Sequence, residues 1–201
     1  MTSPKPAAEI AASGNARELL AWLERGDGRG YIGEPVSQLE HALQCAAAAE
    51  NARAPDEAVI AALFHDVGHL VGEGEPDMAG LGVINHEGIG ARFLREAGCS
   101  DALAELVEAH VAAKRYLCFR DSAYLAKLSE ASRGTLEFQG GPMLEDEARR
   151  FEAAPNSRWI LALRSWDDRA KDPRADPPGL ETYRERLEDH LLATSLGRTA
   201  C

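Results

Sequence analysis

The stretch from Ala61 to His69, with the sequence AALFHDVGH, constrains the fold of this chain more than any other. A helical run of apolar residues leads directly to two adjacent titratable residues, His65 and Asp66. Polar groups buried among Ala, Leu and Phe destabilise a fold unless something binds them. Imidazole and carboxylate together are typical ligands of a divalent metal ion. We therefore interpret this stretch as the floor of a metal site at the end of a helix.

The composition argues against several classes of protein. A length of 201 residues suits a single domain that folds without disulfides. The 33 acidic and 22 basic residues give a formal charge of -11, so neither nucleic acid nor an anionic membrane is expected as a partner. The start of the chain has no signal-peptide pattern, and no apolar run is long enough to span a membrane. The cysteines form no C-x-x-C pair, as expected of reduced thiols in a cytoplasmic protein; they are Cys45, Cys99, Cys118 and Cys201.

Frequent alanine and rare β-branched runs predict an all-α fold. Gly68 is expected to end a helix, and Asn85 and Ser100 to cap the next two. Residues 71–82 are expected to form a Gly-rich rim or lid, and residues 134–143 to be non-helical. Capping residues, Pro and Gly predict helices at Ala7 (or Asn15)–Glu24, Ser37–Asn51, Ala58–Asp66, His86–Ala97, Asp101–Ala113, Asp121–Glu130, Leu144–Ala153, Ser157–Lys171 and Glu181–Leu192.

The histidines gather in the central part of the chain, at or near predicted helix ends. Four of them, together with Asp66 and a late aspartate, supply six ligands, which is too many for one metal ion with an open position but suits two ions. Asp66 would then bridge the ions. The candidate ligands among the histidines are His41, His65, His86 and His110. His69 is expected to support the ligands from behind or to face the substrate. His190 lies in the polar tail and is expected at the surface.

Each histidine taken alone also has a simpler interpretation. A lone imidazole on an apolar helix face, such as His41, is more often a hydrogen-bonded core residue, and His69 could be a residue of a surface loop. The adjacent pair His65 and Asp66 is harder to explain in this way. Adjacent side chains on a helix do not face each other, so these two cannot simply satisfy one another.

The order His…His-Asp…Asp resembles the pattern of the HD-domain superfamily. It is carried by His41, by His65 and Asp66, and by an aspartate in residues 164–171. The added His86 and His110 make the chain similar to the subgroup with dinuclear sites. More narrowly, it is similar to the mixed-valent diiron oxygenases that cleave the carbon–phosphorus bond of 1-hydroxyphosphonates, relatives of inositol oxygenase. The segments that carry this likeness are Tyr31-Ile32-Gly33-Glu34, His110–Leu117 and Leu136–Met143.

The resemblance implies a single-domain HD-type helical bundle with a dinuclear metal site between its helices. Its core would span about residues 31–171, with peripheral helices at residues 7–25 and 181–192. The implied cofactors are two iron ions in the mixed-valent Fe(II)/Fe(III) state, with O2 as co-substrate. Asp167 is preferred to Asp168 as a ligand because the family pattern places a lysine four residues later, which matches Lys171. One iron would be held by His41, His65, Asp66 and Asp167, and the other by Asp66, His86 and His110.

The resemblance also implies roles for residues around the metal ions. Tyr31 and Glu34 match a Tyr-x-x-Glu pair that moves on substrate binding, so they are expected to gate the site and to contact the far end of the substrate. The phosphonate dianion needs positive charge and hydrogen-bond donors. The residues expected to supply them are Lys114, His69, Ser132 and Gln139.

Three functions are open at this point. The first is a diiron oxygenase that converts a 2-amino- or 2-trimethylammonio-1-hydroxyethylphosphonate to a carboxylic acid and phosphate. As such the chain is expected to be a monomer or weak dimer whose organophosphonate substrate comes from an upstream hydroxylase. The second is a metal-dependent HD phosphohydrolase acting on a nucleotide or other phosphomonoester, for which His86 and His110 would be dispensable. The third is a non-catalytic binding or signalling domain.

Overall fold

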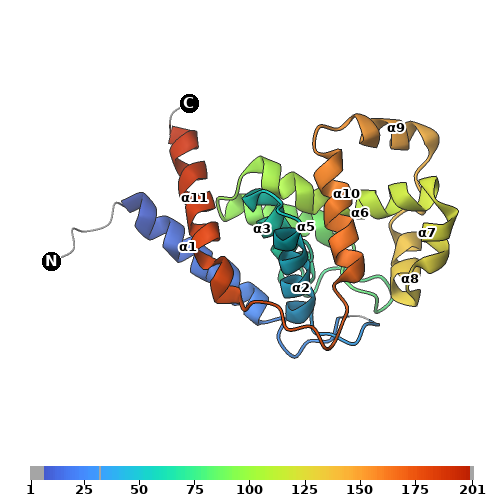
Figure 1. Cartoon of the computed structure of the whole chain (residues 1–201), viewed down its shortest axis with the longest axis horizontal. Coiled ribbons are helices and arrows are strands. Elements are labelled where there is room, and N and C mark those ends of the chain that lie inside the picture. The colour runs from blue at the N-terminus through green and yellow to red at the C-terminus, as the bar shows by residue number, and fades with distance from the viewer. Residues whose placement is uncertain (1–6, 32, 200–201) are drawn as a thin grey trace.

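The computed structural model describes residues 7–31 and 33–199, and helices make up most of this part (Figure 1). The only β-structure in the described ranges is two isolated bridges, Gly30–Ser37 and Asp77–Val83. The prediction of an all-α fold is confirmed. The first six residues, Ile32 of the predicted gate segment and Cys201 lie outside the described residues. The helices are α1 (Ala7–Glu24), α2 (Gln38–Asn51), α3 (Asp56–Phe64), α4 (Gly68–Val71), α5 (His86–Glu96), α6 (Asp101–Arg120), α7 (Ser122–Lys127), α8 (Glu130–Phe138), α9 (Glu145–Ala153), α10 (Ser157–Arg169), the 3-10 helix η1 (Leu180–Tyr183) and α11 (Arg184–Thr199).

Helix α3 is the centre of the hydrophobic core. Its residues from Ala58 to Phe64 are each at most 1% exposed. A helix that is apolar on every side must be enclosed by other elements, and α3 packs against α2, α6, α10 and α11. The chain that leaves its C-terminal end, beginning with His65 and Asp66, therefore starts inside the molecule.

The helices that surround α3 begin where their capping residues predict. At the start of α2, Ser37 Oγ accepts a hydrogen bond from the Glu40 backbone N–H (3.1 Å), and Glu40 Oε2 accepts one from the Ser37 N–H (2.6 Å). Ser100 Oγ caps α6 by accepting from the Leu103 N–H (3.2 Å). Helix α6 continues to Arg120, past the predicted end at Ala113, so His110 lies in the middle of a helix and not in its last turn.

The first and last helices of the described chain, α1 and α11, cross and pack against each other at one end of the molecule (Figure 1). Tyr183 and Leu187 are fully buried, and both helices contribute side chains to the same core cluster as α3. The prediction that His190 lies at the surface is wrong. Its ring is half-buried, and its Nε2 accepts a hydrogen bond from the Ser100 backbone N–H (3.1 Å). The division into an HD core and peripheral helices stays a prediction.

The prediction that residues 134–143 are non-helical is wrong for the first half of the segment. Helix α8 runs through Gly134 to Phe138, and α7 ends at Lys127, before the predicted Glu130. The Ser129 hydroxyl caps α8, and buried Leu136 anchors it. Tertiary packing here outweighs the low helix propensity of glycine. A Cβ at Gly134 would lie 2.5 Å from Leu81 Cδ1, so the glycine allows the 71–82 segment to approach α8.

Gly68 and Asn85 have different roles from those predicted. Helix α3 ends at Phe64, and Gly68 begins the short helix α4 instead of ending α3. A Cβ on Gly68 would lie 1.8 Å from the His86 carbonyl oxygen, so the position needs glycine because two backbone segments meet there. Asn85 has a left-handed backbone with a φ of 58° and makes no side-chain cap. The close approach of α4 to α5 brings His86 next to Asp66.

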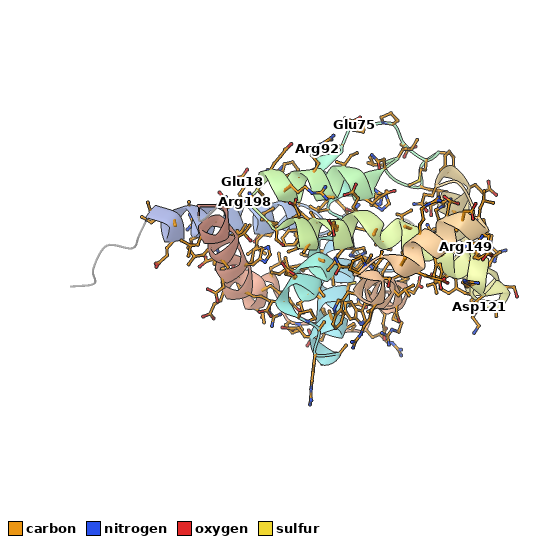
Figure 2. All side chains as sticks on the ribbon, turned by 90° about the horizontal axis from the view of Figure 1, so that it is seen from above. Glu18, Glu75, Arg92, Asp121, Arg149 and Arg198 are labelled. Atoms are coloured by element: carbon orange, nitrogen blue, oxygen red, sulfur yellow. The ribbon has the colours of Figure 1, made fainter. Side chains whose placement is uncertain are left out.

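Charged side chains cover the outside of the molecule. Figure 2 shows Glu75, Asp121 and Arg149 at its periphery, and all three are exposed. Among the described residues, no helix combines the length and the apolarity that crossing a bilayer requires.

The variant Gly68→Ala is expected to lower the free energy of unfolding by about 3 kcal/mol, because its methyl group must displace the backbone at His86. Urea unfolding followed by circular dichroism measures this change. Gly14→Ala is the matched control, since Gly14 lies in α1 with nothing within 4 Å of an added Cβ. It should raise stability by about 0.5–1 kcal/mol. Equal stability of the two variants would contradict the close contact.

Candidate metal centre

Four helices and one short connection bring the six predicted metal ligands together. His41 lies in α2, His110 in α6 and Asp167 near the end of α10, while His86 is the first residue of α5. His65 and Asp66 follow the last residue of α3. The four histidines and Asp167 are each at most 4% exposed, and the side chain of Asp66 is 14% exposed. The site therefore lies inside the helical bundle.

The first group of candidate ligands comprises His41, His65, Asp66 and Asp167. The Nε2 atoms of His41 and His65 are 3.1 Å apart. Asp66 Oδ2 lies 3.7 Å from His41 Nε2 and 3.4 Å from His65 Nε2. Asp167 Oδ1 approaches the same two nitrogens at 3.4 Å and 3.9 Å. Two imidazoles and two carboxylates thus converge on one point.

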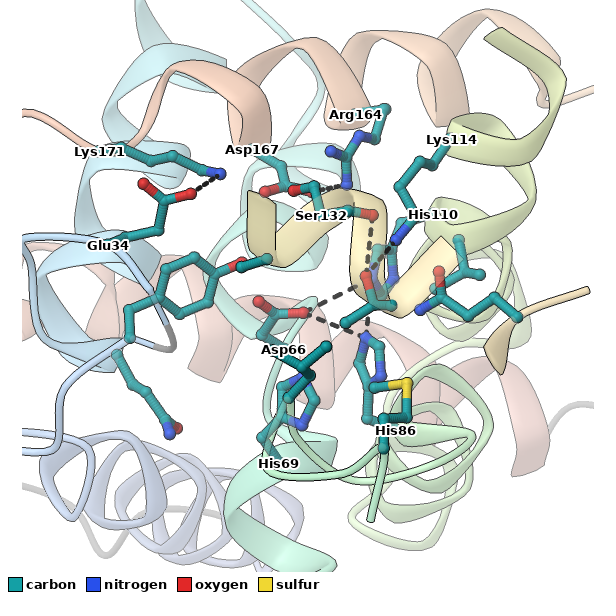
Figure 3. Close-up of a pocket in the computed structure, with 18 residues that line it drawn as sticks. Glu34, Asp66, His69, His86, His110, Lys114, Ser132, Arg164, Asp167 and Lys171 are labelled. Atoms are coloured by element: carbon teal, nitrogen blue, oxygen red, sulfur yellow. Dashed lines mark hydrogen bonds and ion pairs between the residues drawn. The ribbon is translucent and has the colours of Figure 1, made fainter. Parts of the chain in front are cut away.

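The second group shares Asp66 with the first. The Nε2 atoms of His86 and His110 are 3.1 Å apart, and Asp66 Oδ1 lies 3.4 Å and 3.5 Å from them. The two oxygens of Asp66 therefore face two different histidine pairs, as Figure 3 shows for the His86 and His110 side. Asp66 is therefore placed where a carboxylate could bridge two cations.

The hydrogen bonds of the imidazoles show that the residues fit metal ions. Nδ1 of His41, His65 and His110 donates to a backbone carbonyl at 2.7–2.8 Å, to Ala170, Ala62 and Val107 respectively. Their Nε2 atoms then carry the lone pairs, which face the centre of each group. Two facing lone pairs 3.1 Å apart repel each other unless a cation lies between them. The donor set suits two divalent transition-metal ions.

The electrostatics agree with a site built to hold positive charge. Burial raises the pKa of the Asp66 carboxyl, but the neighbouring His65 and His86 imidazoles outweigh burial and hold this pKa well below its usual value. Burial likewise opposes ionisation of Asp167, and the Arg164 guanidinium and His41 overcome it, so that its pKa is also low. Burial lowers the pKa of His65, yet the Asp66 carboxylate raises it overall. Both carboxylates are ionised, and together with the lone pairs on the imidazole Nε2 atoms they favour a cation.

A pocket opens beside the metal ligands (Figure 3). One wall carries buried cations. Lys114 Nζ donates to Thr135 Oγ1 (2.8 Å), and burial, with a contribution from nearby Arg164, lowers the pKa of this lysine to about 8. The opposite end holds Glu34, which accepts a hydrogen bond from Lys171 Nζ (2.7 Å). The pocket thus offers positive charge at one end and an ion pair at the other.

The remaining predicted residues all line this pocket: Tyr31, Glu34, His69, Lys114, Ser132 and Gln139. The ring of Tyr31 stacks on His41, with centroids 4.0 Å apart. His69 stacks on His86 at the same distance, and its Nδ1 accepts from the Val83 N–H (3.1 Å). Burial, with His86 close by, lowers the pKa of His69 to about 3, so this imidazole is neutral. Gln139 Oε1 is buried without a hydrogen-bond partner among the described residues.

Sequence reasoning missed two residues of the site, Arg164 and Thr135. Arg164 is 5% exposed, lines the pocket and donates to Asp167 Oδ2 (2.6 Å). Its spacing of three residues before Asp167 on a helix is the signal that could have revealed it. Thr135 lies in the segment wrongly predicted as non-helical, and this error concealed its contact with Lys114.

The HD domain family model matches residues 38–150, which is more than half of the chain. The chain belongs to the HD-domain family, and the expected resemblance is confirmed. The order of its candidate ligands, His, His-Asp and Asp, is the pattern on which that expectation was based.

Curated relatives match nearly the whole chain. A [1-hydroxy-2-(trimethylamino)ethyl]phosphonate dioxygenase (glycine-betaine-forming) of Leisingera caerulea is 41% identical over 175 residues, covering 86% of this chain and 87% of the relative. A hydroxymethylphosphonate dioxygenase of Gimesia maris is 37% identical over 171 residues, with coverage of 84% and 85%. An uncharacterized protein of Acanthamoeba polyphaga mimivirus is 36% identical over 179 residues, with coverage of 88% and 82%. The narrower resemblance to hydroxyphosphonate-cleaving oxygenases is confirmed as well.

Binding of two metal ions should stabilise the folded chain, because only the folded chain brings the two ligand groups together. At a free metal concentration of about 100 times Kd, the gain is about 2.7 kcal/mol for each bound ion, seen as a higher midpoint of thermal unfolding. Asp66→Ala removes the carboxylate that faces both groups, so it should lose the paired metal ions and most of this gain.

His190→Ala is the control for that measurement. This variant loses an imidazole that belongs to neither ligand group. Metal analysis should therefore find the same metal content as in the unmodified chain. Two metal ions retained by Asp66→Ala, or metal lost from His190→Ala, would mean that the wrong residues have been chosen.

Proposed function

We propose that this chain is an oxidoreductase that uses O2 to cleave the carbon–phosphorus bond of a small 1-hydroxyphosphonate, releasing a carboxylic acid and phosphate. The observation that carries the proposal is the position of Asp66, whose two oxygens face separate histidine pairs beside a pocket with buried cations. The relatives named as dioxygenases of two different hydroxyphosphonates support the same reaction class. The reaction balances in oxygen, because both atoms of O2 are accounted for in the carboxylic acid and the phosphate.

The cofactors that we propose are two iron ions in the mixed-valent Fe(II)/Fe(III) state. His41, His65, Asp66 and Asp167 would hold one, and Asp66, His86 and His110 the other. When bound, the irons would supply the redox capacity for the reaction with O2 and a Lewis acid for the substrate. Asp167 is favoured over Asp168 because its Oδ1 lies 3.4 Å from His41 Nε2, whereas Asp168 is hydrogen-bonded to Tyr124 and Arg164.

The protein's own residues would bind and orient the substrate. Lys114 supplies positive charge, and neutral His69 supplies a hydrogen-bonding imidazole. Ser132 and Gln139 offer polar groups on the same pocket. These side chains suit the phosphonate, whose dianion needs several donors. Holding the phosphonate there would bring C1 and its hydroxyl group to the metal side of the pocket.

Tyr31 and Glu34 would act at the other end of the substrate. The Tyr31 ring covers His41, so it must move for a substrate to reach that side of the site. Glu34 is ion-paired with Lys171, and an amino or trimethylammonio substituent would compete with this lysine for the carboxylate. Tyr31 and Glu34 are therefore suited to act as a gate that opens for a substrate with a cationic end.

The hydrolytic alternative is not favoured. A phosphohydrolase would leave His86 and His110 without a use, yet the protein brings them to the same carboxylate as His65. The relatives with named activities are dioxygenases. As further parts of the proposal, the chain would act in the cytoplasm as a monomer or weak dimer, on a substrate supplied by an upstream hydroxylase.

Phosphate release from a panel of 1-hydroxyphosphonates tests the reaction. The panel includes hydroxymethylphosphonate and the 2-amino and 2-trimethylammonio 1-hydroxyethyl compounds. The iron-loaded protein should release phosphate in air, with one O2 consumed per phosphate, and none under argon. Phosphate release that is equal with and without O2 would favour hydrolysis and overturn the proposal.

Lys114→Met tests phosphonate recognition. Loss of one charge-assisted hydrogen bond should raise the KM for the substrate about 10- to 100-fold. Lys127→Met is the control, because Lys127 is exposed on α7 and does not line the pocket. Steady-state kinetics should leave the KM of the control unchanged. An unchanged KM in Lys114→Met would remove this residue from the phosphonate site.

A further inference from the structure

Arg164 is the buried centre of a partly buried hydrogen-bond network beside the candidate metal ligands. Its Nε donates to Tyr124 Oη (2.9 Å), its Nη1 to Asp167 Oδ2 (2.6 Å) and its Nη2 to Asp168 Oδ1. The Tyr124 hydroxyl in turn donates to Asp168 Oδ2 (2.7 Å). Arg164, Tyr124 and Asp168 thus form a closed ring of hydrogen bonds, which we call the arginine ring. Asp167 is attached to this ring through the guanidinium.

The arginine ring decides which oxygen of Asp167 faces the histidines. Oδ2 is taken by Arg164, so only Oδ1 is left toward His41, at 3.4 Å, and His65, at 3.9 Å. A carboxylate with both oxygens free could rotate and offer either of them. Held in this way, Asp167 can offer one oxygen to a metal ion, in one direction.

The guanidinium itself needs to be held. An arginine side chain has several rotatable bonds, and a single contact with a carboxylate three residues away leaves its plane free to turn. The contacts at Nε and Nη2 hold a second edge of the planar group, and together with the Nη1 contact they fix its orientation. Tyr124 on α7 and Asp168 on α10 provide these contacts. Their side chains therefore matter to Asp167 because they hydrogen-bond to the guanidinium that holds it.

We propose that Tyr124 and Asp168 are positioning residues of the metal site, acting through Arg164 on Asp167. They fix the guanidinium, and the guanidinium fixes the one oxygen that Asp167 presents beside His41 and His65. The proposal rests on the proposed function in one respect, that Asp167 is a metal ligand. It also gives a reason for the two consecutive aspartates on α10, since one faces the histidines and the other completes the arginine ring.

The chain contains a matched control for this network. Tyr116 Oη donates to Glu152 Oε1 (2.7 Å), and Arg120 Nε donates to the same oxygen (3.0 Å). The same three kinds of side chain are therefore combined, although here the tyrosine and the arginine donate to one carboxylate oxygen. This second group joins α6 to α9 at the exposed surface, and none of its members lines the pocket. Variants of this second group therefore measure what such hydrogen bonds contribute to stability alone.

The experiment is a titration of Fe(II) into the metal-free protein under anaerobic conditions, for the unmodified chain, Tyr124→Phe, Asp168→Asn, Asp167→Ala and Tyr116→Phe. Asp167→Ala identifies which of the two ions depends on that carboxylate. Tyr124→Phe and Asp168→Asn should weaken the binding of this same ion about 10- to 100-fold and leave the other ion unchanged. In the iron-loaded enzyme kcat should fall more than KM changes. Tyr116→Phe should bind both ions like the unmodified chain.

Other outcomes decide against the proposal in distinguishable ways. If Tyr124→Phe and Asp168→Asn bind both ions normally and only their thermal midpoints fall, as in Tyr116→Phe, the arginine ring is merely structural and the proposal is wrong. If Asp167→Ala binds both ions normally, Asp167 is not a ligand, and the ligand assignment fails together with the proposal. If the unmodified chain binds no pair of ions, the proposed function itself fails.

Discussion

The structure depends on one buried carboxylate, that of Asp66. Its two oxygens lie 3.4–3.7 Å from the Nε2 atoms of four imidazoles that come from four parts of the chain. Such a concentration of titratable groups inside a protein destabilises the fold unless each group has a partner. The backbone carbonyls behind three of the rings, the guanidinium behind Asp167 and the shared Asp66 provide these partners. Two bound metal ions would complete the set.

Asp66 reaches this position because of the apolar helix that precedes it. Helix α3 is enclosed on all sides, so the residues after Phe64 emerge into the interior and not at the surface. Gly68 then allows the backbone of α4 to meet the carbonyl group of His86. The second histidine pair is thereby brought to the carboxylate, at the place where α4 and α5 pack. Stability and function are linked here, since the same close packing that fills the core also places the ligands.

The pocket is electrostatically different from the rest of the molecule. The chain carries a formal net charge of -11, yet the pocket is lined by Lys114, Arg164 and Lys171. Burial makes the charge of Lys114 less favourable, which the lowering of its pKa to about 8 reflects. Placing an anionic ligand next to this ammonium group would recover the lost solvation. An acidic protein can therefore bind a phosphonate dianion through a few buried cations, without a basic surface.

The sequence by itself determined the helical class, the capped starts of α2 and α6, and the candidate histidines with Asp66, because apolar periodicity, capping side chains and the His-Asp pair are local signals. Only the tertiary structure decided that α8 is a helix despite Gly134, that His190 is half-buried, and that Asp167 and not Asp168 faces His41. It also revealed Arg164, whose partner Tyr124 is 40 residues away in the sequence. Local patterns specify which groups are present, whereas the direction in which a carboxylate or a guanidinium points depends on contacts between distant segments, which no local pattern records.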